Sequence, residues 1–152
     1  MIRNNNIDSK LHNNENVNYD LAVVTGLPRS GKSLLSPIVS SFKRSENFNM
    51  EYLLEQIPML NFMGKMSDDA VIYLFRYAID LILYNNKIGR NTNLRFGDET
   101  SIWNTKSPIK YLRRLFSKEG SQVYREIEKE VPIFILVLHS ALYYANILFK
   151  TF

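Results

Sequence analysis

Two glycines, a lysine and a serine stand at a spacing that can hold an anion. They follow the pattern G-x-x-x-x-G-K-[ST], in which glycines allow a tight turn and a close approach of the backbone to the anion. Successive N–H groups of such a loop converge on one point. Lys32 adds a positive charge, and the hydroxyl of Ser33 can bind a phosphate oxygen or a metal ion. The predicted anion-binding residues are Gly26, Leu27, Pro28, Arg29, Ser30, Gly31, Lys32 and Ser33.

Such a loop needs a buried strand before it and a helix after it, and the sequence predicts both. Residues 21–24 form a short apolar run that is typical of a buried parallel strand. Residues 32–42 have a helical pattern, which Pro37 should bend or shorten. The positive end of this helix would reinforce the anion site. A glycine turn that only joins strand to helix, with its lysine exposed, is the structural alternative.

The middle of the chain is predicted to be helical. Ser67 and the two aspartates after it should begin a helix that is almost wholly buried. A polar loop, residues 88–103, follows with a short strand at 94–96. The predicted helices of this part cover residues 50–56, with Asn49 as cap and Pro58 as stop, and residues 70–84, 108–116 and 121–130.

The C-terminal part predicts a second buried strand, residues 132–138, and a helix from Ala141. Residues 131–149 carry no formal charge, and a membrane span needs about 20 apolar residues. Polar residues and a proline interrupt this stretch, and its first half is β-branched. We therefore favour strand, turn and helix over a membrane span.

His139 comes directly after the second predicted strand. Ligands of open parallel sheets gather at the carboxyl ends of strands, so His139 and the loop should lie at one edge. A neutral imidazole could take a proton from an attacking hydroxyl. The alternative is a structural histidine bonded to a neighbouring carbonyl. Asp98 and Glu99 could hold Mg²⁺, but their strand is weak, and we favour a surface loop for them.

The composition is that of one globular domain in a reducing, cytoplasmic setting. The chain has 152 residues, 45% of them hydrophobic, and it lacks the cysteines of a disulfide framework or a cysteine zinc site. Its net charge is only +4, but residues 87–118 hold eight lysines and arginines. This segment should favour an anionic partner, unless it is simply a solvated helix face. We expect no nucleic acid partner.

Two further expectations concern the extent of the domain. Residues 1–18 are rich in asparagine and are predicted to be a flexible leader, which leaves residues 19–152 as one unit. Only two strands are convincing, so the sheet would keep unpaired edges. We therefore expect the chain to be the N-terminal portion of a larger domain.

The loop resembles that of P-loop nucleotide-binding proteins and, within them, of sulfotransferases. The sulfotransferase form P-[KR]-S-G-T-[ST] is similar to residues 28–33, except that Lys32 replaces the usual threonine. The resemblance implies that this loop holds 3′-phosphoadenosine 5′-phosphosulfate (PAPS). It also implies that Arg29 and Lys32 stabilise developing charge, with His139 as the candidate base. Residues 131–152 also resemble the family's strand, turn and helix.

We therefore expect an α/β, P-loop-type three-layer fold with a parallel sheet, rich in helix and incomplete. The favoured activity is sulfonate transfer from PAPS to a hydroxyl acceptor that the sequence does not identify. The alternatives are a kinase or other NTPase that uses ATP or GTP with Mg²⁺, for which Lys32 is the usual residue, and a non-catalytic nucleotide-binding module.

Overall fold

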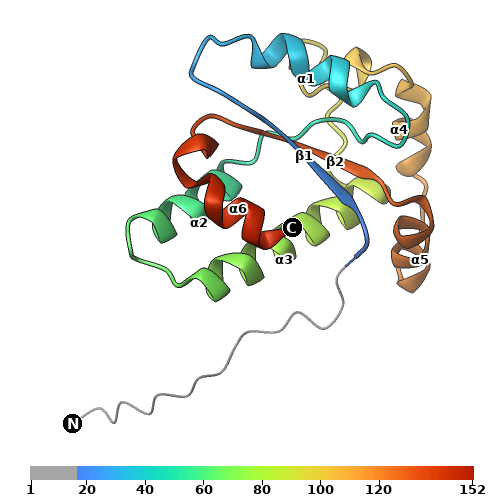
Figure 1. Ribbon diagram of the computed structural model, residues 1–152. Helices are drawn as coiled ribbons and strands as arrows, with labels where there is room; N and C mark the ends of the chain where they lie inside the picture. The colour runs from blue at the N-terminus through green and yellow to red at the C-terminus, as the bar shows by residue number, and fades with distance from the viewer. Residues whose placement is uncertain (1–16) are drawn as a thin grey trace.

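The computed structural model describes residues 17–152, which fold around a small parallel sheet (Figure 1). Strand β1 (Asp20–Thr25) pairs with β2 (Ile133–Leu138), from Asp20 opposite Ile133 to Thr25 opposite Leu138. Both strands lie where the apolar runs predicted them. The expectation of a mixed α/β fold with a parallel sheet is confirmed.

An irregular third segment, residues 44–49, lies along the other edge of β2. The backbone amide of Glu46 donates to the carbonyl of Ile133 at 3.0 Å, and that of Val137 donates to the carbonyl of Asn49 at 2.9 Å. These bonds make β2 the central strand of the sheet. The prediction that Asn49 caps a helix is wrong, because its backbone pairs with β2 instead.

Helices cover both faces of the sheet, because alternate side chains of a strand point to opposite faces. Phe134, Leu136 and Leu138 of β2 pack into the larger core, while Ile135 and Val137 pack into a smaller one. Figure 1 shows α1 (Lys32–Ser40) on one side of the strands and α2 (Tyr52–Phe62), α3 (Asp68–Lys87) and α6 (Ala145–Thr151) on the other.

Helix α3 contributes a single stripe to the larger core. Val71, Phe75, Ile79 and Leu83 recur every fourth residue and are all fully buried. Apolar residues outside this stripe, such as Tyr77, stay exposed. The prediction that this helix is almost wholly buried is therefore wrong, because only one of its faces packs against the core.

Several other elements differ from the predicted ones. Helix α2 continues through Pro58 to Phe62, and Pro58 is itself buried, so packing compensates for the lost backbone bond. Residues 94–96 form no strand in the structure. The helix expected from Ala141 begins as a 3₁₀ turn. The remaining elements are η1 (Ile102–Asn104), α4 (Pro108–Arg114), α5 (Ser121–Glu130) and η2 (Ala141–Tyr144).

The predicted leader lies mostly outside the described residues. Of its last two positions, which are described, Val17 is buried in the larger core, so at least this residue belongs to the folded domain. Among residues 17–152, no helix has the length and apolar character that crossing a membrane requires.

Candidate phosphate-binding site

The predicted loop joins β1 to α1 and borders an open hollow of about 370 Å³. Residues 28–33 line this hollow together with His139, which follows β2 directly. Strand β1 leads into the loop and β2 ends beside it, because the two strands are parallel and in register. The structure thus brings the loop and His139 together at the carboxyl edge of the sheet, as expected for ligand sites of open parallel sheets.

A side chain at Gly26 would meet the Ser30 hydroxyl and a strained backbone. A Cβ atom at this position would lie 2.7 Å from the hydroxyl oxygen of Ser30, and the backbone φ of 154° is one that other residues rarely adopt. The loop folds back on itself at this point, with the amide of Ser30 donating to the carbonyl of Leu27 at 3.2 Å. A glycine at position 26 is therefore required by the shape of the loop.

Lys32 is buried, with its ammonium group inside the loop. Its Nζ donates to the carbonyls of Gly26 and Leu27, both at 2.7 Å. In the alternative interpretation, a glycine turn that only joins the strand to the helix would leave this lysine exposed, which is not the geometry found. An ammonium group has three N–H donors, so one remains for a ligand in the hollow. Lys32 consequently holds the loop together and places a positive charge beside the space that the loop encloses.

The other loop residues present polar groups at the surface. Arg29 has a left-handed backbone with φ of 63°, and its side chain is exposed beside the hollow, as is that of Ser33. Helix α1 begins at Lys32, and the first N–H groups of a helix lack acceptors within it. The edge of the hollow thus combines two cations, hydroxyl groups and the positive end of a helix.

His139 is paired with a carboxylate that the sequence analysis did not single out. Glu55 of α2 accepts hydrogen bonds from the backbone amides of His139 and, at 3.2 Å, Ser140. The same oxygen, Oε1, lies 3.4 Å from the imidazole Nδ1. The alternative of a histidine bonded to a neighbouring carbonyl is therefore not the arrangement found. Glu55 is the only charged residue of α2. A single acidic residue in an otherwise apolar helix is the sequence feature that could have identified Glu55 as a functional candidate.

The surroundings of Glu55 are largely dry. Its side chain is only 12% exposed, whereas that of His139 is 41% exposed toward the hollow. Tyr144 lies nearby, and burial together with the charge of Glu55 raises the pKa of its hydroxyl to about 12. The pair therefore joins a protected carboxylate to an imidazole that a ligand can reach.

Asp98, one of the two acidic residues considered as Mg²⁺ ligands, lies in a surface loop, as predicted. It accepts a hydrogen bond from the Asn93 amide at 3.1 Å and lies 3.8 Å from Arg95, outside the hollow of residues 28–33. Its neighbour Glu99 is exposed. Within residues 17–152, no group of three or more histidine, aspartate or glutamate side chains is arranged to hold a metal ion.

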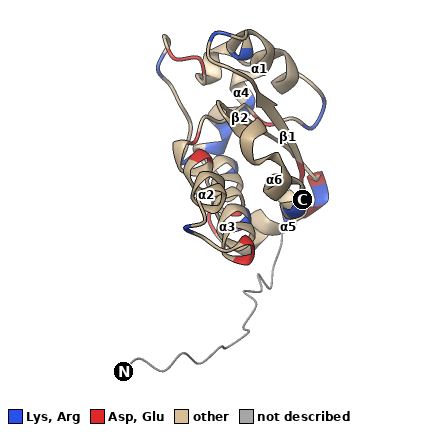
Figure 2. Cartoon of the chain, turned by 60° about the vertical axis from the view of Figure 1, so that its left-hand side comes forward, with Lys and Arg blue, Asp and Glu red and all other residues tan. Residues whose placement is uncertain are grey.

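Much of the charge of the basic segment is paired with carboxylates of the same chain. Arg114 binds both carboxylate oxygens of the buried Glu46, at 2.7 and 2.8 Å. Lys87 and Lys110 lie 3.3 and 3.6 Å from the same carboxylate, and Arg90 pairs with Glu119 at 2.5 Å. Basic residues indeed gather near α4 (Figure 2). The predicted anionic attraction of residues 87–118 is weakened, because these four cations already have carboxylate partners.

Comparison of the chain with protein-family models, with curated proteins and with solved structures finds no match.

Proposed function

We propose that this chain is a P-loop nucleotide-binding protein that transfers a sulfonate group from PAPS to a hydroxyl acceptor. The observation that supports this proposal most strongly is the shared hollow. Arg29 and Lys32 belong to the loop and His139 lies more than 100 residues later in the sequence, yet all three border one space. Anion-binding groups and a candidate base are thus adjacent, as a group transfer to a hydroxyl requires.

The residues of the hollow suit a phosphosulfate group. Gly26 lets the backbone close around an anion, and Lys32 and the amides at the start of α1 would bind its oxygens. All the side chains that border the hollow are cationic, hydroxyl-bearing, small or imidazole. A positively charged lining can stabilise a sulfonate group during transfer, because hydrogen-bond donors that are already in position stabilise the negative charge as it develops.

The proposed reaction assigns one role to each group. The acceptor oxygen forms a bond to sulfur while the bond from sulfur to the bridging phosphate oxygen breaks, which releases 3′-phosphoadenosine 5′-phosphate. The proton of the acceptor hydroxyl passes to His139, and Glu55 orients the ring and stabilises the charge that it gains. Arg29 and Lys32 stabilise the negative charge that develops on the bridging oxygen.

A kinase or NTPase that uses ATP or GTP with Mg²⁺ is the second candidate, and Lys32 is the observation that favours it. The ATP- and GTP-binding form of the loop has lysine at this position, where it contacts the β- and γ-phosphates, and Ser33 would then contact Mg²⁺. A kinase depends on that metal ion, whereas the proposed sulfonate transfer relies on arginine, lysine and backbone amides.

Calorimetric titration separates the two candidates. The protein is titrated with 3′-phosphoadenosine 5′-phosphate and with ATP, each in Mg²⁺ and in EDTA. We expect tighter binding of the 3′-phosphorylated nucleotide, little changed by EDTA. The Lys32→Ala variant should bind at least about tenfold more weakly, since a charge-assisted contact is lost. The exposed Lys43, outside the loop, provides the matched control Lys43→Ala.

Two results would count against the proposal. Preferential ATP binding that depends on Mg²⁺ would favour the kinase. Equal affinities of the wild-type protein and Lys32→Ala, with unchanged circular dichroism, would show that residues 26–33 are a structural turn and not a binding site.

A further inference from the structure

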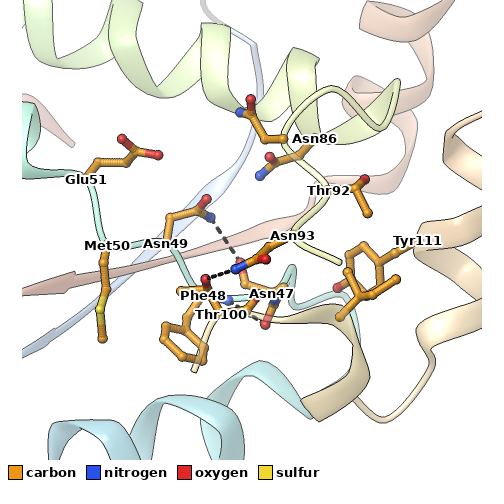
Figure 3. A pocket seen from close by; sticks show the side chains of 12 residues that line it. Asn47, Phe48, Asn49, Met50, Glu51, Asn86, Thr92, Asn93, Thr100 and Tyr111 are labelled. Atoms are coloured by element: carbon orange, nitrogen blue, oxygen red, sulfur yellow. Dashed lines mark hydrogen bonds between the residues drawn. The ribbon is translucent and has the colours of Figure 1, made fainter. Parts of the chain in front are cut away.

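A second hollow, of about 140 Å³, lies beside β2 on the side away from β1. Segment 47–51, the end of α3 and the loop after it surround this space, and Figure 3 shows the side chains of Asn49, Asn86 and Asn93 between them. Five of its twelve lining residues are asparagine, and Thr92, Thr100 and Tyr111 add hydroxyl groups. A liquid water molecule occupies about 30 Å³, so the hollow has room for part of a ring-sized polar ligand.

Three of the asparagines build the wall of the hollow. Asn47 donates from its side chain to the carbonyl of Thr100 at 2.7 Å, and Asn49 donates to the carbonyl of Asn47 at 3.0 Å. Asn93 donates to the hydroxyl of Thr100 at 2.9 Å and to Asp98. These bonds tie the polar loop to the segment beside β2, so the wall is held in place before any ligand binds.

The other two asparagines leave their amide groups for a ligand. The side chains of Asn86 and Asn91 line the hollow, and neither makes a hydrogen bond to any residue between 17 and 152. Each amide offers two N–H donors and a carbonyl acceptor. A sugar hydroxyl also both donates and accepts, so it can satisfy such a group. The one formal charge in the lining is the carboxylate of Glu51, which would disfavour an anionic ligand.

An exposed aromatic surface belongs to the same loop. The rings of Phe96 and Trp103 stack at a centroid distance of 4.9 Å and an angle of 6°. The indole N–H of Trp103 donates to the carbonyl of Leu94 at 2.9 Å, which fixes the ring pair. Phe96 is nevertheless 77% exposed. Trp103 directly follows Ile102, which lines the hollow. An apolar ring surface and a polar hollow in one loop suit a ligand with an apolar face and a hydroxyl-bearing edge, as a pyranose ring has.

The hollow and the glutamate and histidine pair are connected through α2. Glu51 lines it at the start of α2, and Glu55 follows four residues later. Four residues of helix rise about 6 Å, so the first turn of α2 connects the lining of the hollow to Glu55.

From these observations we infer that the amide-lined hollow binds a neutral saccharide, with Asn86 and Asn91 contacting its hydroxyls and the exposed ring of Phe96, which Trp103 holds in place, contacting its apolar face. The inference that this saccharide is the acceptor rests on the function proposed above. Its binding alone does not depend on the nucleotide site.

The test uses neutral sugars as probes: methyl glucoside, methyl galactoside, N-acetylglucosamine and lactose. Their binding is followed by saturation-transfer NMR and by shifts of the asparagine side-chain amides. We expect at least one sugar to bind at millimolar concentration and to shift the Asn86 and Asn91 amides. Asn86→Leu should weaken its binding about tenfold, because an amide that contacts hydroxyls is lost.

Matched variants separate the hollow from the general surface. Asn85→Leu makes the same change one residue earlier on α3, outside the lining, and should leave sugar binding unchanged. Phe96→Ala should weaken binding, whereas Phe116→Ala, which removes an 88% exposed ring elsewhere, should not. Lack of binding by every sugar at tens of millimolar, or equal binding by wild type and Asn86→Leu, would overturn the inference.

Two controls distinguish this inference from the proposed function. Lys32→Ala should bind the sugar normally, because Lys32 does not line the amide-lined hollow. Sugar binding without any nucleotide binding would leave the saccharide site standing and refute the proposed transfer. Preference for an aryl alcohol such as 4-nitrophenol at the Asn86 amides would refute the saccharide site while leaving the transfer proposal intact.

Discussion

The carboxylate of Glu55 joins helix α2 to the end of β2 by accepting the backbone amide of His139, and it lies 3.4 Å from the imidazole Nδ1 of the same residue. The two residues are 84 positions apart in the sequence. Because Glu55 occupies the Nδ1 side of the ring, Nε2 is the nitrogen that remains for a ligand in the hollow of residues 28–33. This arrangement resembles the pairing of a base with an orienting acid in general-base catalysis.

If His139 is the base, its removal should slow the chemical step most. For His139→Ala we expect kcat to fall by about 10²- to 10⁴-fold, with little change in nucleotide affinity. Glu55→Gln retains an oxygen for the backbone amides but loses the charge, so it should lower kcat less and change the pH profile. The exposed Glu128 on α5 supplies the control Glu128→Gln. Equal kcat and pH profiles for all three variants and the wild type would remove the catalytic role.

Gly26→Ala should disturb the loop for two reasons: its backbone has a positive φ, and its Cβ would displace a neighbouring side chain. Both Gly26→Ala and Gly64→Ala place a Cβ on a backbone with positive φ, which costs about 1–3 kcal/mol. Only at Gly26 would the Cβ also displace the Ser30 hydroxyl, whereas the space around Gly64 is open. We expect nucleotide affinity to fall for Gly26→Ala alone. Urea unfolding and calorimetry would measure both effects, and unchanged affinity of Gly26→Ala would contradict this account.

The bonds of Lys32 to the carbonyls of Gly26 and Leu27 should make the loop rigid without a ligand. We therefore expect faster amide hydrogen exchange in residues 26–31 of Lys32→Ala, while the buried stripe of α3 keeps its protection. Mass spectrometry of exchanged peptides would measure the difference. Identical exchange in the variant and the wild type would show that these two bonds do not hold the loop.

Glu46 should make stability depend on pH in acid. Burial by itself would raise the pKa of its carboxyl, but the hydrogen bonds and charge of Arg114, with Lys87 and Lys110, outweigh burial and lower the pKa to about 2. A carboxylate whose pKa is lower in the folded state stabilises the fold above its unfolded pKa of 4.5. That stabilisation is lost as the pH falls from about 4.5 toward 2.

Removal of one partner of a buried ion pair costs about 3–5 kcal/mol, so Glu46→Gln should destabilise the fold by about this amount at pH 7. The difference in free energy of unfolding between Glu46→Gln and the wild type should shrink between pH 4.5 and pH 2. Urea titrations at several pH values measure it, and Glu128→Gln again serves as the exposed control. A difference that stays constant down to pH 2 would contradict the assigned role of Glu46.

Local patterns of the sequence were enough to predict the loop and the strands. The spacing of Gly26, Gly31 and Lys32 restricts the backbone within a few residues, and an apolar run such as 133–138 must be buried wherever the chain takes it. Pro108 and the apolar spacing after it likewise predicted α4. Such features depend on neighbours in the chain, so they can be recognised without knowledge of the fold.

The tertiary structure alone determined which residues distant in the sequence form hydrogen bonds and ion pairs with each other. Asn49 had the residue type of a helix cap, but the open edge of β2 offered its backbone a better set of hydrogen bonds. Arg114 belonged to a basic segment that suggested an anionic partner, but Glu46, 68 residues away, is buried against it. Glu55 and His139 likewise meet only because α2 crosses the end of β2. In each case a polar group had several partners available, and the packing of the apolar core determined which of them came within hydrogen-bond distance.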